Sequence, residues 1–99
     1  MSTEVVIDEK IEITVKEPGK YNVIFLNDDV TPMEWVIEVL VNIFKYSQEN
    51  ATELTLEVHN DGSAVVGTYS YEIAEQKCAE VITASRNHGF QLQVKVEEE

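Results

Sequence analysis

The junction between residues 21 and 35 restricts the possible folds more than any other part of the sequence. A short run of aromatic and branched residues, YNVIFL at 21–26, is typical of a buried β-strand. A few residues later, Thr31, Pro32 and Glu34 stand where a helix places its cap, its first residue and the acidic member of a capping box. We therefore predict a strand that passes almost at once into a helix capped by Thr31.

The rest of the sequence alternates between the same two periodicities. Ser47 is a candidate cap for a second, shorter helix, and Ser70 is a candidate cap for a third helix that ends at residues 87–89. Residues 64–69 are strand-like, and residues 92–96 alternate apolar and polar side chains, as in a strand with one wet face. We predict an α+β fold in the order β-α-α-β-α-β, with a three-stranded, mostly antiparallel sheet packed with three helices.

Apolar residues at helical spacing predict which helix faces are buried. In the first helix this face contains Met33, Val36, Ile37, Leu40, Ile43 and Phe44. In the third helix, Cys78 shares a stripe with Ala74 and Val81, which favours a packing role over a nucleophilic one. Because Cys78 is the only cysteine, an intramolecular disulfide is excluded.

A chain of 99 residues has room for one hydrophobic core, so we predict a compact single domain. Pro18-Gly19 interrupts the pattern near the start. Residues 1–19 are therefore interpreted as a mobile N-terminal arm, residues 20–97 as the folded domain and residues 98–99 as an acidic tail. The domain is expected to be a monomer.

The net charge of −12 restricts the possible partners. A field of this sign repels phosphate backbones and anionic lipid surfaces, so neither nucleic acid nor a membrane is an expected partner. No apolar run reaches the ~18–20 residues of a membrane span, and the first ten residues lack the features of a signal peptide or presequence. We expect a cytoplasmic protein.

Enzyme motifs are missing from the sequence. It contains no Gly-x-Gly-x-x-Gly, no phosphate-binding Gly-Lys-Thr loop and no His-Glu-x-x-His. We therefore expect no catalytic residues and no cofactor. A divalent metal on Asp28, Asp29 and His59 is a weak alternative, because such a site normally needs three or four ligands in fixed geometry and the chain has only two histidines.

Asn27, Asp28 and His59 allow two readings. Taken singly, the carboxylates favour the start of a helix through its dipole, and an imidazole in a last helical turn can contact free carbonyl groups. Taken together, an amide oxygen, a carboxylate and a neutral imidazole nitrogen match the three donors and single charge of an ammonium group. With Met33 and Val36 beside them, they predict a site for a free amino terminus with a large apolar first residue.

The sequence resembles the ClpS family, adaptors that recognise destabilising N-terminal residues and transfer proteins to an ATP-dependent Clp protease. The similarity spans about residues 21–96. It depends on four stretches, YNVIFLNDDVTPMEWVIEVL, ATELTLEVHNDG, GTYSYEIAEQKCAEV and LQVKVEE. The block Asn-Asp-Asp-x-Thr-Pro-Met-Glu with a later Val-His is its most specific part.

The resemblance implies roles for individual residues. Asn27, Asp28 and His59 match positions that bind the substrate α-amino group, and Met33 matches the methionine that gates the side-chain pocket. The other implied pocket positions are Thr31, Val36, Thr55, Val58 and Leu92. Glu72 and Lys77 match positions that dock on the N-terminal domain of the Clp ATPase, and the arm before Tyr21 matches the extension involved in delivery.

Two departures from the family pattern bear on specificity. Thr55 stands where many members carry a methionine, which removes apolar bulk from the pocket wall and adds a hydroxyl. Phe90-Gln91 replaces an expected His-Pro before Leu92, which affects the rim. A different class remains as the alternative, a small interaction domain of ribosomal-stalk type that has a similar shape but no amine pocket.

Overall fold

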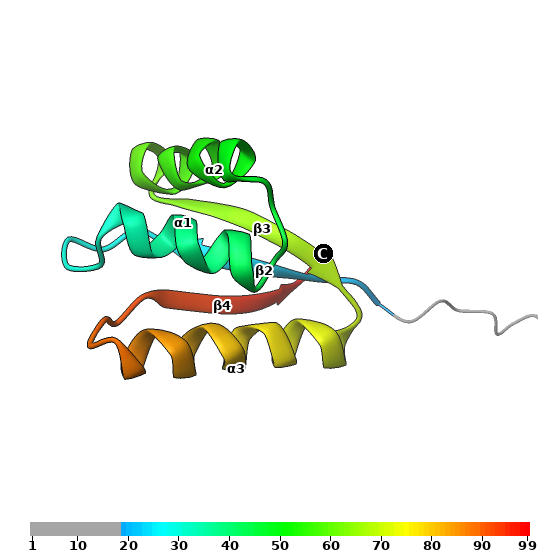
Figure 1. Cartoon of the computed structure of the whole chain (residues 1–99). Coiled ribbons are helices and arrows are strands. Elements are labelled where there is room, and N and C mark those ends of the chain that lie inside the picture. Colours follow the sequence, from blue (N-terminus) through cyan, green and yellow to red (C-terminus); the bar gives the residue numbers. More distant parts are fainter. Residues whose placement is uncertain (1–18) are drawn as a thin grey trace, which may run out of the picture.

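The computed structural model describes residues 19–99, so most of the predicted arm, residues 1–18, lies outside the described residues. The predicted order β-α-α-β-α-β is confirmed (Figure 1). The elements are β2 (Tyr21–Leu26), α1 (Met33–Asn42), α2 (Gln48–Asp61), β3 (Ser63–Tyr69), α3 (Tyr71–Asn87) and β4 (Gln93–Glu98). Strand β4 extends to Glu98, the first residue of the predicted acidic tail, and the Glu98 side chain is exposed. Within residues 19–99, no helix is long and apolar enough to cross a membrane.

The sheet has the strand order β3-β2-β4, and both pairings are antiparallel. Phe25 of the central strand pairs with Ala64 on one side and with Val94 on the other. A register shift between Val23 and Ile24 interrupts the ladder with β3. Figure 1 shows α2 along β3, α3 along β4, and α1 between the two helices. Among residues 19–99 the first strand, β2, is therefore central, and its end at Leu26 opens toward α1 and α2.

One cluster of buried side chains joins the sheet to the helices. Val23 and Phe25 of β2 are fully buried, and the Phe25 and Phe44 rings meet edge to face at 5.6 Å between centroids. The remaining members of the cluster are Trp35, Val36, Val39, Leu40, Ala51, Val58, Ala64, Val66, Ala74, Val81 and Leu92. This single core agrees with the prediction of one domain.

The start of α1 differs from the prediction. Pro32, in extended conformation, is the cap residue, and its carbonyl accepts the N–H of Trp35 at 3.1 Å. Within the described part of the chain no side-chain hydrogen bond caps this helix, so the prediction that Thr31 caps it, with Glu34 completing a capping box, is wrong. The physical reason is that the Thr31 side chain is held within the loop, where its hydroxyl donates to the Asp28 carboxylate at 2.9 Å.

The buried face of α1 also differs in part from the predicted one. Trp35 and Val39 are buried, whereas Met33 is 37% exposed. The indole N–H of Trp35 donates to the Ser85 hydroxyl of α3 at 2.8 Å, and this buried hydrogen bond turns α1 toward α3. A polar contact between distant helices therefore rotates the helix away from the face that its apolar spacing indicates.

The other two helices begin at the predicted caps. The Ser47 hydroxyl accepts the Asn50 N–H at 3.1 Å, while Ser70 occupies the cap position of α3 without a side-chain hydrogen bond. Gly62 ends α2 in the left-handed conformation, with φ of 90°. Cys78 is partly buried; burial and the nearby Glu75 charge raise the pKa of the thiol, which fits the predicted packing role.

Candidate functional site

The loop between β2 and α1 is held together by Asp28. Its Oδ1 accepts the backbone N–H groups of Val30 at 2.8 Å and Thr31 at 2.6 Å, while its Oδ2 accepts the Thr31 hydroxyl. Short Asp side chains commonly stabilise turns by bonding to the backbone two or three residues on. This turn carries the chain from the sheet into α1 and fixes the position of both flanking residues.

Hydrogen bonding also determines the charge of Asp28. Partial burial raises its pKa, but the hydrogen bonds from the Thr31 N–H, the Val30 N–H and the Thr31 hydroxyl together outweigh that effect. The pKa of Asp28 is therefore held below its ordinary value of 3.8. The loop consequently carries a firm negative charge at neutral pH.

One backbone hydrogen bond brings the loop next to the end of α2. The N–H of Asn27 donates to the carbonyl of Gly62 at 2.9 Å. Gly62 is the C-cap residue of α2, and His59 lies in the last turn of that helix. The end of β2 is thereby fixed beside a residue that follows it by more than thirty positions in the sequence.

A pocket of about 210 Å³ lies between this loop, α1 and α2. Its lining residues are Asn27, Asp28, Asp29, Thr31, Met33, Val36, Thr55, Val58 and His59. The three predicted amine-binding residues thus meet in one cavity with five of the six predicted side-chain-pocket residues. Leu92 does not line this pocket: it is buried in the core and borders a second cavity between α3 and β4.

The polar and apolar parts of the pocket differ in exposure. Asn27 and His59 are exposed, so their side chains are accessible to a ligand. Val36 and Val58 are nearly fully buried and form an apolar wall. Met33 is the most exposed apolar lining residue. The arrangement offers hydrogen-bond acceptors and negative charge beside an apolar recess.

Thr55 contributes to the wall in a way that its sequence position did not reveal. Its side chain is only 2% exposed, and its hydroxyl donates to the Ala51 carbonyl of the same helix at 2.8 Å. The polar atom is therefore satisfied within α2. Compared with a methionine, Thr55 widens the pocket without adding a free donor to it.

Asp29 is the lining residue whose role the sequence left open. It is exposed, and among residues 19–99 its carboxylate forms no hydrogen bond or salt bridge. Asp28 is committed to the turn, so Asp29 adds a second negative charge whose oxygens are unoccupied within that part of the chain. The Asp-x-x-Thr spacing is the signal that would have identified Asp28 as a turn residue.

The two predicted docking residues lie on α3, away from the pocket lining. Glu72 is exposed in the first turn. The Lys77 ammonium donates to the Ile43 carbonyl at 2.8 Å and lies 5.8 Å from the centroid of the Phe44 ring. Lys77 therefore also stabilises the end of α1, a contact that the sequence did not predict.

The metal alternative receives no support from the geometry. Within residues 19–99, no three His, Cys, Asp or Glu side chains are close enough together to share a metal ion. Asp28, Asp29 and His59 line one pocket but do not form such a group.

Known proteins match the chain over most of its length. A family model described as "ATP-dependent Clp protease adaptor protein ClpS" matches residues 16–95. The ATP-dependent Clp protease adapter protein ClpS of Treponema denticola is 54% identical over 81 residues, which cover 82% of this chain and 80% of that protein. The protein of the same name from Campylobacter jejuni is 51% identical over 85 residues, covering 86% and 88%.

A solved structure matches the fold as well. ClpS2 of Agrobacterium tumefaciens, determined bound to L-phenylalaninamide, superposes with a TM-score of 0.81 at 37% identity. The match covers 84% of this chain and all of that one. The predicted family is confirmed, and it replaces the ribosomal-stalk alternative. The chain belongs to the ClpS family of ATP-dependent Clp protease adaptors.

Proposed function

We propose that the protein binds polypeptides through a free α-amino group and a large hydrophobic first side chain, Leu, Phe, Tyr or Trp, and delivers them to a Clp AAA+ ATPase for degradation. The observation that carries the proposal is the single pocket in which Asn27, Asp28 and His59 meet an apolar wall. The ligand of the Agrobacterium relative supports it, since L-phenylalaninamide has a primary amine and a benzyl group.

The proposed amine-binding half of the site is supported by a comparison of the ammonium's donors with the pocket's acceptors. A primary ammonium has three N–H donors and one positive charge. The Asn27 side-chain oxygen and a neutral His59 nitrogen are exposed acceptors. Asp28 contributes the firm negative charge of the turn, and Asp29 adds a second one at the same pocket. Acetylation removes the charge and two of the three N–H donors, which leaves acceptor groups of the site unpaired.

The side-chain half follows from size and polarity. At about 210 Å³ the pocket is smaller than the ~300–1,000 Å³ of typical small-molecule clefts, so it suits one amino-acid side chain. Val36, Val58 and the Thr55 methyl group form apolar surface, and the flexible Met33 thioether adjusts at the more exposed side. A small first residue forfeits roughly 1.5–3 kcal/mol of apolar burial.

Recognition in this mechanism involves no bond making or breaking. Binding depends on charge pairing and burial alone, so the proposal assigns the protein no catalytic residue. Degradation is the work of the protease with which the adaptor acts, and selectivity comes from the two halves of the pocket together.

Docking on the Clp ATPase is assigned to the start of α3. Glu72 is exposed there between two exposed hydrophobic residues, Tyr71 and Ile73. A charge beside apolar surface is typical of a protein–protein contact. Lys77 lies on the same helix, and its bond to the Ile43 carbonyl leaves part of the side chain accessible. We assign this surface to the N-terminal domain of the Clp ATPase.

The proposal is tested by fluorescence anisotropy with labelled peptides that differ only at residue one. Peptides that begin with Phe or Leu should bind, and a peptide that begins with Gly should bind at least about tenfold more weakly, because it fills none of the recess. Asn27→Ala should weaken the Phe peptide, whereas Asn60→Ala, an exposed amide outside the pocket lining, should not. Equal binding of the Phe and Gly peptides would exclude the side-chain pocket.

Docking needs a separate measurement with the purified N-terminal domain of the Clp ATPase. Glu72→Lys should weaken the complex in calorimetry while peptide binding stays unchanged. Glu75→Lys, an equal charge reversal one turn further along α3, is the matched control. If both variants weaken the complex equally, the effect is one of net charge and the assignment to Glu72 is wrong.

A further inference from the structure

The amine pocket is one of two cavities that lie along α1 and α2. It is lined by the first turn of α1 and the second half of α2. The other, of about 360 Å³, is lined by α1 from Glu34 onward and by the first residue of α2, and it is called the distal cavity below. Its lining residues are Glu34, Ile37, Glu38, Val41, Asn42 and Gln48.

The apolar side of α1 continues from one cavity to the other. Met33, Ile37 and Val41 are spaced four residues apart, so their side chains lie in line along the helix. Met33 lines the amine pocket, whereas Ile37 and Val41 line the distal cavity. Ile37 and Val41 are half-buried and pack against the core. From Met33 to Val41 the helix rises about 12 Å, which is the length of this apolar stripe.

The side of α2 that faces α1 also connects the two cavities. Its residues at helical spacing are Gln48, Thr52, Thr55 and His59. Gln48 lines the distal cavity, whereas Thr55 and His59 line the amine pocket. Thr52 lies between them and is partly buried, and its hydroxyl donates to the Gln48 carbonyl at 2.8 Å. Because this hydroxyl is satisfied within α2, Thr52 adds no unpaired donor between the cavities.

The distal cavity combines apolar surface with negative charge. Ile37 and Val41 supply the apolar surface, and Glu34 and Glu38 are exposed carboxylates one helical turn apart. Like charges at this spacing repel each other, and among residues 19–99 neither glutamate forms a salt bridge. A lysine or arginine side chain has a long aliphatic stem and a cationic end. Such a side chain therefore matches both parts of the cavity.

We propose that the distal cavity binds a Lys or Arg side chain at about the fourth position of a substrate whose amino terminus occupies the amine pocket. The inference rests on the proposed function, which places the first residue beside Met33. An extended chain advances about 3.3 Å per residue, so three further residues span about 10 Å along the apolar stripe. The stem packs on Ile37 and Val41, and the cation lies between Glu34 and Glu38, where it relieves their repulsion.

The two glutamates have a simpler partial explanation. Exposed helix faces commonly carry charged residues, and Glu34 in the first turn of α1 is favoured by the helix dipole. These effects account for each carboxylate singly. They do not require a cavity with apolar walls, nor its alignment with the amine pocket along the same two helices.

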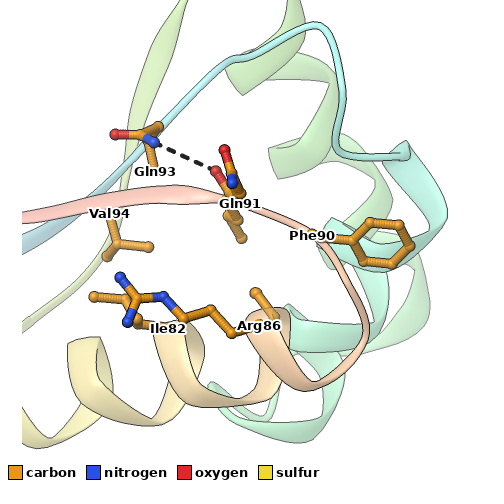
Figure 2. A pocket seen from close by; sticks show the side chains of 8 residues that line it. Ile82, Arg86, Phe90, Gln91, Gln93 and Val94 are labelled. Atoms are coloured by element: carbon orange, nitrogen blue, oxygen red, sulfur yellow. Dashed lines mark hydrogen bonds between the residues drawn. The ribbon is translucent and has the colours of Figure 1, made fainter.

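A larger cavity, of about 480 Å³, does not suit the same side chain. It lies between α3 and β4, where Figure 2 shows Arg86 extending from α3 beside Val94. The positive charge of Arg86 repels a lysine or arginine of the substrate. This cavity also shares no lining residue with the amine pocket, whereas the distal cavity continues the line of Met33.

The test uses three labelled peptides that begin with Phe, have a free amine and are otherwise built from alanine. The first carries arginine at the fourth position, and the second carries citrulline there, which keeps the shape of arginine without its charge. The third carries its arginine at the eighth position. The first and third peptides have the same net charge, so a difference between them does not come from the overall charge of −12. Affinities are measured by fluorescence anisotropy in 0.15 M NaCl.

The peptide with arginine at the fourth position should bind at least about threefold tighter than either of the others. Replacing both carboxylates, Glu34→Gln with Glu38→Gln, should abolish this preference. Glu75→Gln with Glu80→Gln is the matched control, because it removes the same charge from α3 and neither residue lines the distal cavity. The control protein should keep the preference of the wild type.

Equal affinity of the three peptides would overturn this inference and leave the amine pocket standing. A preference that survives in the Glu34→Gln, Glu38→Gln protein would also overturn it, because the cation would then bind elsewhere. Failure of all three peptides to bind would overturn the amine pocket, and with it this inference. The two proposals therefore fail in different ways.

Discussion

The N–H of Asn27 donates to the Gly62 carbonyl at 2.9 Å, and this hydrogen bond sets the distance between the two ends of the amine site. Gly62 has φ of 90°, a conformation that costs a residue with a side chain about 1 kcal/mol. Gly62→Ala should therefore lower the free energy of unfolding by about that amount. Because the strain acts between Asn27 and His59, it should also weaken binding of a Phe-initiated peptide.

Gly89 provides the matched control for this prediction. It has φ of 81° at the end of α3, and a Cβ at either glycine meets no atom within 4 Å, so only backbone strain is compared. Gly89→Ala should lower the free energy of unfolding by a similar amount and leave the affinity for the peptide unchanged. If Gly62→Ala binds the peptide as tightly as the wild type, the Asn27–Gly62 contact does not position the site.

The lowered pKa of Asp28 predicts a pH dependence of stability. A carboxyl group whose pKa is lower in the folded than in the unfolded chain stabilises the fold fully above the unfolded value. That contribution is lost as the pH falls below 3.8, through the lower pKa of the folded state. Asp28→Asn keeps the turn acceptor but loses the charge, so it should be less stable by about 1 kcal/mol at pH 7.

The difference in the free energy of unfolding between the wild type and Asp28→Asn isolates the effect of Asp28 from those of the many other acidic groups. Urea denaturation at pH 7, 5 and 3 should show a constant difference at the two higher values and a smaller one at pH 3. A difference that grows on acidification would reverse the sign and contradict the assignment of the lowered pKa to the turn.

Much of the fold was predictable from local sequence. The period of the apolar residues and the caps at Ser47 and Ser70 define elements that the chain forms nearly where expected. The features of the fold that the sequence did not predict depend on contacts between distant residues. Trp35 is buried because its indole N–H reaches Ser85, fifty positions away, and no local pattern reports such a bond.

In the candidate site, too, the sequence predicts some features and misses others. Asn27, Asp28 and His59 were identified by residue type and by resemblance, yet nothing local indicated that Gly62 would bring them together. The spacing of Thr31 predicts a helix cap, in which its hydroxyl would accept a backbone N–H, but the hydroxyl instead donates to the Asp28 carboxylate within the loop. Local rules identify the groups available, and competition between partners decides which contacts form.

Because Thr55 is smaller than methionine, we expect the pocket to prefer the largest first side chains. Thr55→Met restores apolar bulk to a pocket of about 210 Å³ and should weaken a Trp-initiated peptide roughly tenfold more than a Leu-initiated one. Thr55→Val is the control, because the hydroxyl that it removes faces Ala51 within α2 and not the recess. Anisotropy should give the valine variant wild-type selectivity. A Thr55→Val protein with altered selectivity would mean that the hydroxyl contacts the ligand.

His59 predicts that binding needs a hydrogen-bond acceptor at this position. A neutral imidazole has one acceptor nitrogen for the substrate ammonium. His59→Gln keeps an acceptor, whereas His59→Ala has none, so a Phe-initiated peptide should bind the glutamine variant more tightly than the alanine variant in the anisotropy assay. Equal affinity of the two variants would exclude His59 as the acceptor.

The central claim is that the pocket holds a free amino terminus, and a matched pair of peptides tests it most directly. One labelled peptide begins with Phe and has a free amine, and its twin is N-acetylated but otherwise identical. The account predicts saturable binding of the first and no saturable binding of the second, because the acetyl group removes the charge that Asn27, Asp28 and His59 recognise. Equal binding of the two peptides would contradict the account.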